Sequence, residues 1–220
     1  TITFGFFFLS KLLQKKTGWV LLNPILVAIA MLICFLQFTG VSYETYSEAG
    51  SLVEFWLKPA VVALGVPLYL QLRMIKKQLM PILISQLAGC VVGLVSVTII
   101  AKLMGASPEV IMSLAPKSVT TPIAMEVSNA VGGIPSLTAA VVIVVGLFGA
   151  ICGFKLLQVG RVASPIAQGL SMGTAGHAVG TSRAMEVSGK YGAYASLGLT
   201  LNGILTALLS PTILHILGLY

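Results

Sequence analysis

Two stretches decide the fold of this chain: APKSVTTPIAMEVS at residues 115–128 and GTAGHAVGTSRAMEVS at residues 173–188. Both end in the same five letters, AMEVS, sixty residues apart. Aligning 116–137 with 176–197 at that offset gives ten identities in twenty-two positions. Both copies carry a cation and a glutamate inside otherwise apolar sequence. Polar segments broken by glycine or proline and repeated within apolar sequence are typical of the substrate sites of transporters with internal repeats.

Composition places these stretches in a membrane protein. Hydrophobic residues make up 57% of the 220 and charged residues only 9%, whereas a soluble domain carries about 25% charge. The cations behind the net charge of +7 are spaced between apolar runs, which membrane topology explains better than a nucleic-acid partner. We expect an all-α integral membrane protein with a partial helix at its start. The spans predicted from hydropathy are 19–39, 52–72, 79–103, 134–155 and 194–218.

Charge placement predicts that the two broken stretches do not cross the membrane. The lysines after the first apolar run put that connection in the cytoplasm, so the acidic loop 40–54 lies outside. Lys155 and Arg161 then fall inside only if 107–131 enters and leaves on the outer side. By the same logic 163–191 is a hairpin entered from the cytoplasm. The expected fold is a polytopic helical bundle with two re-entrant hairpins of opposite orientation, an inverted hairpin–helix repeat resembling elevator transporters.

The chain accordingly divides into a more regular half, 1–104, and a polar-cored half, 105–220. A scaffold and a moving transport unit suit these two halves. Non-helical backbone at the membrane midplane is tolerated only where protein or a water-filled cavity surrounds it. We therefore expect the two hairpin tips to lie near the midplane and to face each other.

The first hairpin tip predicts a carboxylate site. Lys117 is a cation at membrane depth, where such residues are functional hypotheses by default. A helix N-terminus with free amides, beside an ammonium and hydroxyls, would bind a carboxylate well. The alternative is that Lys117 pairs with Glu126 and only holds the hairpin in shape. The other residues expected at this tip are Ser118, Thr120 and Thr121, with Pro116 and Pro122 breaking the helix.

The second tip offers a similar set of groups. Arg183 could hold a carboxylate in two-pronged fashion, or pair with Glu186 three residues later on the same helix face. His177 occupies the position of Lys117 in the repeat, and is either a substrate contact or a satisfied hydrogen-bonding residue. Glu126 and Glu186 are also equivalent, and either could take up a proton if buried or pair with the nearby cations. Further candidates are the donors Thr174 and Thr181, and Gly173, Gly176 and Gly180, which permit close backbone approach.

Catalytic and metal-binding motifs are absent from the sequence. It has no nucleophile elbow, no HExxH and no P-loop. The three cysteines, Cys34, Cys90 and Cys152, sit inside apolar spans without metal-ligand spacing. We expect neither an enzyme nor a protein with a metal or other cofactor.

Five segments of the chain closely resemble the LrgB/CidB family, and the resemblance covers nearly all of the chain from about residue 19. PKSVTTPIA and MGTAxHAxGT are the most specific parts of it. The five segments are LNPILVAI at 22–29, KPAVVALGVPLY at 58–69, MGASPEVIMSLAPKSVTTPIAMEVS at 104–128, GGIPSLTA at 132–139 and GLSMGTAGHAVGTSRAMEVSG at 169–189.

This resemblance implies two competing functions. Bacterial members are described as holin- or antiholin-like, regulating murein hydrolase activity and autolysis beside a small LrgA/CidA-type membrane partner. Other members look like carriers of small monocarboxylates: pyruvate in bacteria, and glycolate/glycerate in the plastid translocator, where LrgA-like and LrgB-like parts are fused. Cations at two inverted tips suit an anion carrier. We therefore expect transport of the pyruvate, glycolate/glycerate and lactate class.

The same resemblance implies the surroundings of the protein. The expected location is the bacterial plasma membrane, in contact with lipid, with the plastid inner envelope as the alternative. A scaffold of three or four helices is thin, so we expect a homodimer or a hetero-oligomer with the LrgA/CidA-like protein.

Overall fold

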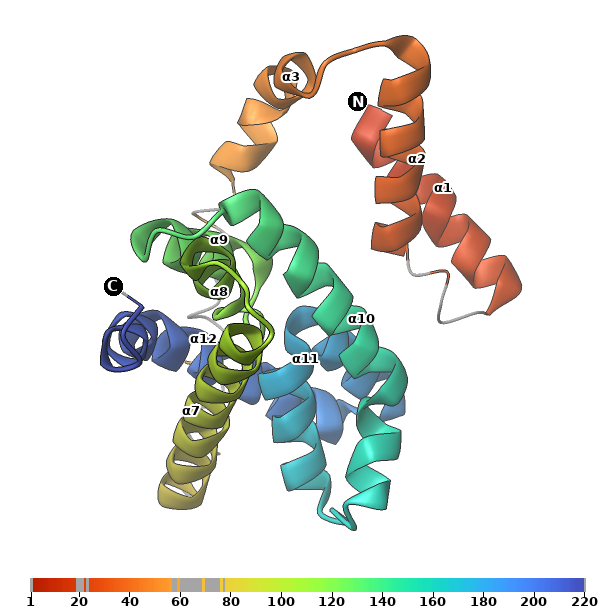
Figure 1. The fold of residues 1–220 in the computed structure, drawn as a ribbon. Helices are drawn as coiled ribbons and strands as arrows, with labels where there is room; N and C mark the ends of the chain where they lie inside the picture. Colours follow the sequence, from red (N-terminus) through yellow and green to blue (C-terminus); the bar gives the residue numbers. More distant parts are fainter. Residues whose placement is uncertain are drawn as a thin grey trace. The chain divides into compact units, whose positions relative to one another are not determined.

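The computed structural model describes residues 2–18, 22, 24–56, 59, 69, 76 and 78–219. These residues form two compact units, 1–59 and 60–220 (Figure 1). The first unit contains α1 (Ile2–Thr17), α2 (Pro24–Thr39) and α3 (Tyr43–Phe55). The second contains α7 (Leu79–Leu103), α8 (Pro108–Leu114), α9 (Thr121–Ala130), α10 (Pro135–Val159), α11 (Pro165–Val187) and α12 (Gly189–Ile216).

In the first unit α1 and α2 pack side by side (Figure 1). The buried Ser10 hydroxyl donates to Phe6 O at 2.7 Å within α1 and also contacts Met31 Sδ of α2. The rings of Phe6 and Phe35 meet edge to face with centroids 5.8 Å apart. The contact between the two helices is therefore mainly apolar, with one small hydroxyl satisfied inside its own helix.

The acidic stretch 40–54, expected to be a loop, is mostly helical because it forms α3. Ser42 caps the helix by accepting a hydrogen bond from Thr45 N at 3.3 Å. Tyr46 OH lies 2.8 Å from Thr3 Oγ1, which joins α3 to α1. The expectation of a loop was wrong because it weighed the charges of this stretch and overlooked its cap. Most of the predicted span 52–72 lies outside the described residues.

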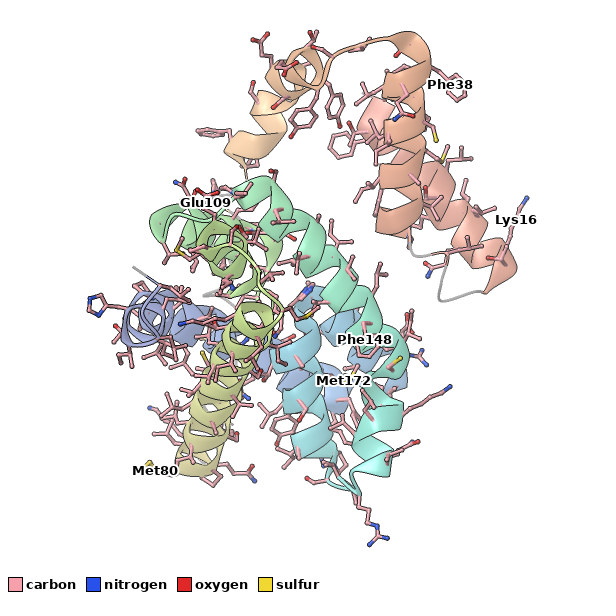
Figure 2. The ribbon with its side chains drawn as sticks, viewed as in Figure 1. Lys16, Phe38, Met80, Glu109, Phe148 and Met172 are labelled. Atoms are coloured by element: carbon pink, nitrogen blue, oxygen red, sulfur yellow. The ribbon has the colours of Figure 1, made fainter. Side chains whose placement is uncertain are left out.

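Three helices of the described chain, α7, α10 and α12, are long and apolar enough to cross a membrane. They confirm the predicted helices over 79–103, 134–155 and 194–218 to within a few residues. At 25 residues, α7 and α10 are each about 37 Å long. Met80 on α7 and Phe148 on α10 show how large apolar side chains remain on the surface of the unit (Figure 2). Such a surface is expected where lipid replaces water.

The segment α8–α9 folds back on itself, with residues 115–120 as its tip. Pro122 stands in the first turn of α9, where its missing N–H costs little. At the base of the hairpin, the Thr138 hydroxyl of α10 lies 2.9 Å from Ser113 O and 2.7 Å from Ser128 Oγ. Ser113 Oγ also accepts a hydrogen bond from Ile134 N at 2.7 Å. All three hydroxyl side chains are fully buried, so this network clamps α8, α9 and α10 together.

The helix α11 folds back at His177, whose backbone has φ 40° and ψ −133°. Beyond this break the chain returns along its first arm, so that Ala184 packs against Met172. A Cβ added to Gly180 would overlap Met172 O, and one added to Gly173 would overlap the backbone of Ala195. Glycine is required at both positions because backbone approaches backbone.

The two hairpins lie along opposite halves of α10. The first is clamped at Thr138 near the start of this helix, and its tip residue Val119 packs on Val142. The second follows the later part of α10, where Gly149 lies against Gly176. Each tip therefore lies against the middle part of α10. Their entry into a membrane from opposite sides stays a prediction, as does the scaffold and transport division at residue 104.

Candidate functional site

Asn202, at the middle of α12, connects the two hairpins. Its Nδ2 donates to Ser118 O in the first tip and to Thr174 O in the first arm of the second hairpin, both at 3.0 Å. The side chain is 1% exposed. A single amide therefore satisfies one carbonyl from each hairpin, 84 and 28 residues away along the chain.

The internal repeat of the sequence accounts for the position of Asn202 in α12. Asn202 stands sixty residues after Val142, the same offset that relates the two AMEVS words. Val142 O accepts a hydrogen bond from His177 Nε2 at 2.8 Å. Each hairpin tip is thus hydrogen-bonded to the long helix of the other repeat. The first tip bonds Asn202 of α12 and the second bonds Val142 of α10, and these two positions are equivalent in the repeat. The two contacts differ in chemistry, because the first repeat uses a backbone carbonyl where the second uses a side-chain amide.

A cavity of about 600 Å³ opens beside Asn202. Its walls come from α7, the first hairpin tip, the first arm of α11 and α12. Among the described residues that line it, Lys117 is the only charged side chain. Its main polar groups besides Lys117 are Ser85, Gln86, Ser118, Ser171, Thr174, Asn202 and Thr206. A cavity of this size with one cation, no described carboxylate and several neutral polar groups is suited to a small anion.

Lys117 is held at the edge of this cavity by its neighbour. Its Nζ donates to Ser118 Oγ at 3.1 Å. Lys117 also lines a second cavity of about 450 Å³, bounded by the last part of α7 from Ser96 to Ala101 and by the connection 104–106. The ammonium therefore stands between two hollows that follow each other along α7.

Of the predicted substrate residues, the structure brings Lys117, Ser118 and Thr174 together in the cavity wall. Thr174 Oγ1 lies 2.8 Å from Gln86 Oε1 of α7, which fixes its direction. The other predicted residues do not line this cavity: Thr120, Thr121, His177, Thr181 and Arg183. Thr120 and Thr181 are buried, and neither hydroxyl has a hydrogen-bond partner in the described structure. A role of these five in binding stays a prediction.

His177 is packed into the protein. Its ring is 3% exposed and lies against Gly146 of α10, where a Cβ would overlap the imidazole. With Nε2 donating to Val142 O, the side chain has the geometry of a satisfied hydrogen-bonding residue. Of the two interpretations open from the sequence, the structure supports this one.

The charged residues in and beside the two AMEVS segments lie on the surface of the second unit. Arg183 Nη1 and Glu186 Oε2 form an ion pair at 2.6 Å, the i,i+3 pairing considered from the sequence. The two side chains are 41% and 65% exposed. Glu126 is exposed as well. A role of either glutamate in proton coupling stays a prediction.

Sequence reasoning missed Asn202 and Gln86, the residues that connect the hairpins to α12 and α7. The signal that could have found them is simple. Each is the only side-chain amide in an otherwise apolar helix of membrane-spanning length, and polar residues inside such helices are commonly functional. No group of three His, Cys, Asp or Glu in the described parts of the chain could hold a metal.

Comparison with known proteins gives a consistent result. The model of the LrgB-like family matches residues 3–216. The holin-like protein CidB of Staphylococcus epidermidis is 38% identical over 213 residues, 97% of this chain and 93% of the relative. CidB of Staphylococcus aureus is 36% identical over the same length and the same shares of both chains. The antiholin-like protein LrgB of Bacillus mycoides is 35% identical over 209 residues, 95% of this chain and 91% of the relative. No solved structure matches.

Proposed function

Because the chain belongs to the LrgB-like family, we propose that it is a bacterial membrane carrier of small monocarboxylates that works with a small LrgA/CidA-type membrane protein. The observation that carries the proposal is the cavity at the hairpin tips. Lys117 is the only charged residue among its described lining, and it stands at the point where two hairpins and two long helices meet. A carboxylate entering there would meet an ammonium and hydroxyl donors without a described opposing acid.

The opposed hairpins support a transport role. If α10 and α12 cross the membrane, their middles lie near the midplane. In that case the two hairpin tips lie at the same depth as Val142 and Asn202. The hairpins then enter the membrane from opposite sides without crossing it. Interrupted helices that meet near the midplane are how many carriers build a substrate site. The two hollows on either side of Lys117 would then give access to it from different ends of α7.

The relatives' names favour a second function, holin- or antiholin-like control of murein hydrolases and autolysis. CidB is named holin-like and LrgB antiholin-like. The names support this alternative better than they support transport. The geometry supports the carrier, because a pore former has no evident use for a cation at the edge of a partly open, mainly apolar cavity that holds a few neutral polar groups. Changed organic-acid flux could connect the two, with autolysis following indirectly.

Uptake into liposomes tests the proposal. The purified chain, with and without the LrgA-like partner, is assayed with radiolabelled pyruvate, glycolate and lactate. We expect uptake of at least one acid in at least one combination. Absence of uptake in every combination, with correctly inserted protein, would argue against the carrier and leave holin-like regulation as the better function.

Lys117→Ala should abolish uptake without lowering the amount of protein in the membrane, because it removes the only described charge of the cavity. Lys102→Ala is the matched control. Lys102 lies on the exposed end of α7, outside the cavity lining, and donates a hydrogen bond to the carbonyl of Leu217 at 3.4 Å. If both variants transport like the parent, Lys117 is not a binding residue. If Lys117→Ala is degraded, its role is structural.

A further inference from the structure

The two hollows that Lys117 lines follow each other along the whole of α7. The larger one, of about 600 Å³, is lined by residues of this helix and its N-cap from Gln78 to Leu94. The smaller one, of about 450 Å³, begins at Ser96 and continues to Met104, directly after the helix ends. Of the described residues, only Lys117 belongs to both linings. The hollows therefore lie end to end along a helix of about 37 Å.

The far ends of the two hollows lie at opposite ends of α7. The larger hollow is lined there by Gln78 and by Ser164, the N-caps of α7 and α11. The smaller one is lined by the connection 104–106 between α7 and α8. If α7 crosses the membrane, these two ends face opposite sides of it. Water can then reach each hollow from a different side.

A thin apolar layer at the first hairpin tip separates the hollows. Ala115 of the tip belongs to the same buried apolar cluster as Cys90 and Leu94 of α7. Leu94 and Ala115 are 2% and 3% exposed, and both line the larger hollow. Leu114, the neighbour of Ala115, lines the smaller one. Apolar side chains at a constriction between two wet spaces exclude water and ions, which is how hydrophobic gates close a path.

We propose that the two hollows are the two halves of one anion path along α7, and that the first hairpin tip against Leu94 is the barrier that divides it. Lys117 lies at this barrier and is the only charged side chain among the described residues of either lining. A single cation there favours anions over cations. The inference concerns the path and not the transported acid. It rests on the proposed crossing of the membrane by α7, and it holds for an inorganic anion as well.

Cysteine labelling in liposomes tests the separate access of the two hollows, in a full chain whose native cysteines are replaced by serine. Ser85 lines the larger hollow and Ser96 the smaller one. We expect an impermeant thiol reagent to reach Ser85→Cys only from the side where α7 begins, and Ser96→Cys only from the side where it ends. Ile84→Cys is the matched control, because Ile84 is 64% exposed outside both linings and should stay unreactive in lipid. Labelling of both positions from one side, or of neither, would overturn the path.

Shortening the barrier tests its position. Leu94→Ala should let chloride leak from liposomes that the parent chain keeps closed, because it removes the largest side chain that α7 contributes to the buried cluster. We expect chloride to leak at least about tenfold faster than potassium, since Lys117 attracts one ion and repels the other. Leu87→Ala is the matched control on the exposed face of α7, outside both linings. Ion-selective electrodes measure both leaks.

Gly93→Leu gives the opposite change. A Cβ built at Gly93 meets open space, so a larger side chain can enter the larger hollow beside the barrier. Combined with Leu94→Ala, it should return the leak toward the parent value. A folded Leu94→Ala that leaks no more than Leu87→Ala contradicts the barrier, and if Leu94→Ala does not fold, the labelling of Ser85→Cys and Ser96→Cys decides. Neither readout uses an organic acid, so the predicted leak together with a failed uptake assay would leave the path standing and overturn only the carrier.

Discussion

Single residues of α10 and α12 that face the hairpin tips are in close contact with them. Gly146 is the clearest case, because the His177 ring occupies the volume that a Cβ would need. Asn202 is a second, since one amide serves two hairpins. At this scale, glycines and amides within apolar helices each make a specific contact with a hairpin.

Gly146→Ala should lower the stability of the protein by about 1–3 kcal/mol, the usual cost of overpacking. The reason is the overlap of the new methyl with the His177 imidazole. The measurement is thermal unfolding in detergent. Gly50→Ala is the control, because the space around that glycine is open.

The His177 contact itself can be checked with the double variant. Gly146→Ala with His177→Ala should be less destabilised than the sum of the two single variants, because the imidazole that the methyl strikes is gone. Strict additivity would show that Gly146 and His177 do not touch.

Arg183→Ala should change monocarboxylate uptake by no more than about fivefold, since an exposed ion pair contributes at most about 1 kcal/mol. Arg183 is paired with Glu186 outside the cavity lining. The same uptake assay, normalised to protein in the membrane, gives the answer. A complete loss of uptake with normal abundance would instead restore Arg183 as a substrate residue.

At the scale of elements, each hairpin is held by a different device. The first is clamped at its base by the hydroxyls of Ser113, Ser128 and Thr138. The second relies on glycines that allow backbone to approach backbone, as Gly173 does against α12. Hydroxyl clamps are directional and glycine contacts are not, so the two hairpins should respond differently to substitution.

Thr138→Val should destabilise the first hairpin by about 1–3 kcal/mol, because it removes the hydroxyl that joins buried polar groups of α8 and α9 and leaves them without this hydrogen-bond partner. Thr200→Val is the matched control. Thr200 is also buried, yet its hydroxyl donates to Ser196 O within its own helix, at 2.9 Å. Unfolding in detergent compares the two. An equal loss in both variants would mean that the clamp adds nothing to the hairpin.

At the scale of the whole molecule, the opposed hairpins predict that the two ends of α10 lie on opposite sides of the membrane. Residue 129 lies near the end of α9, the returning arm of the first hairpin, and residue 158 near the end of α10; both are exposed. If α10 crosses the membrane, cysteines placed there should react with impermeant reagents from opposite sides. The native cysteines at 34, 90 and 152 are replaced first, because all three are free among the described residues. Labelling of both positions from one side would contradict the re-entrant hairpins.

Much of the fold could be predicted from local sequence. Hydropathy located α7, α10 and α12, because a helix in lipid is recognised by a long apolar run. The doubled AMEVS word and the helix breakers around it located both hairpins. The helix α3 was missed because its acidic composition suggested a loop, whereas its Ser42 cap favours a helix. Of the residues predicted to bind substrate, Lys117, Ser118 and Thr174 line the cavity, while His177 turns to α10. A role of any of them in binding stays a prediction.

The sequence by itself determined the membrane class, the long helices, the duplication and the cation at the first tip, because each is encoded in neighbouring residues. Only the tertiary structure decided which side chains share a cavity. Thr174 meets Gln86 from 88 residues away, and Ser118 meets Asn202 from 84. A lone amide in an apolar helix carries no local pattern that names its partner. Its role appears only when the opposed hairpins bring the carbonyls of Ser118 and Thr174 to it.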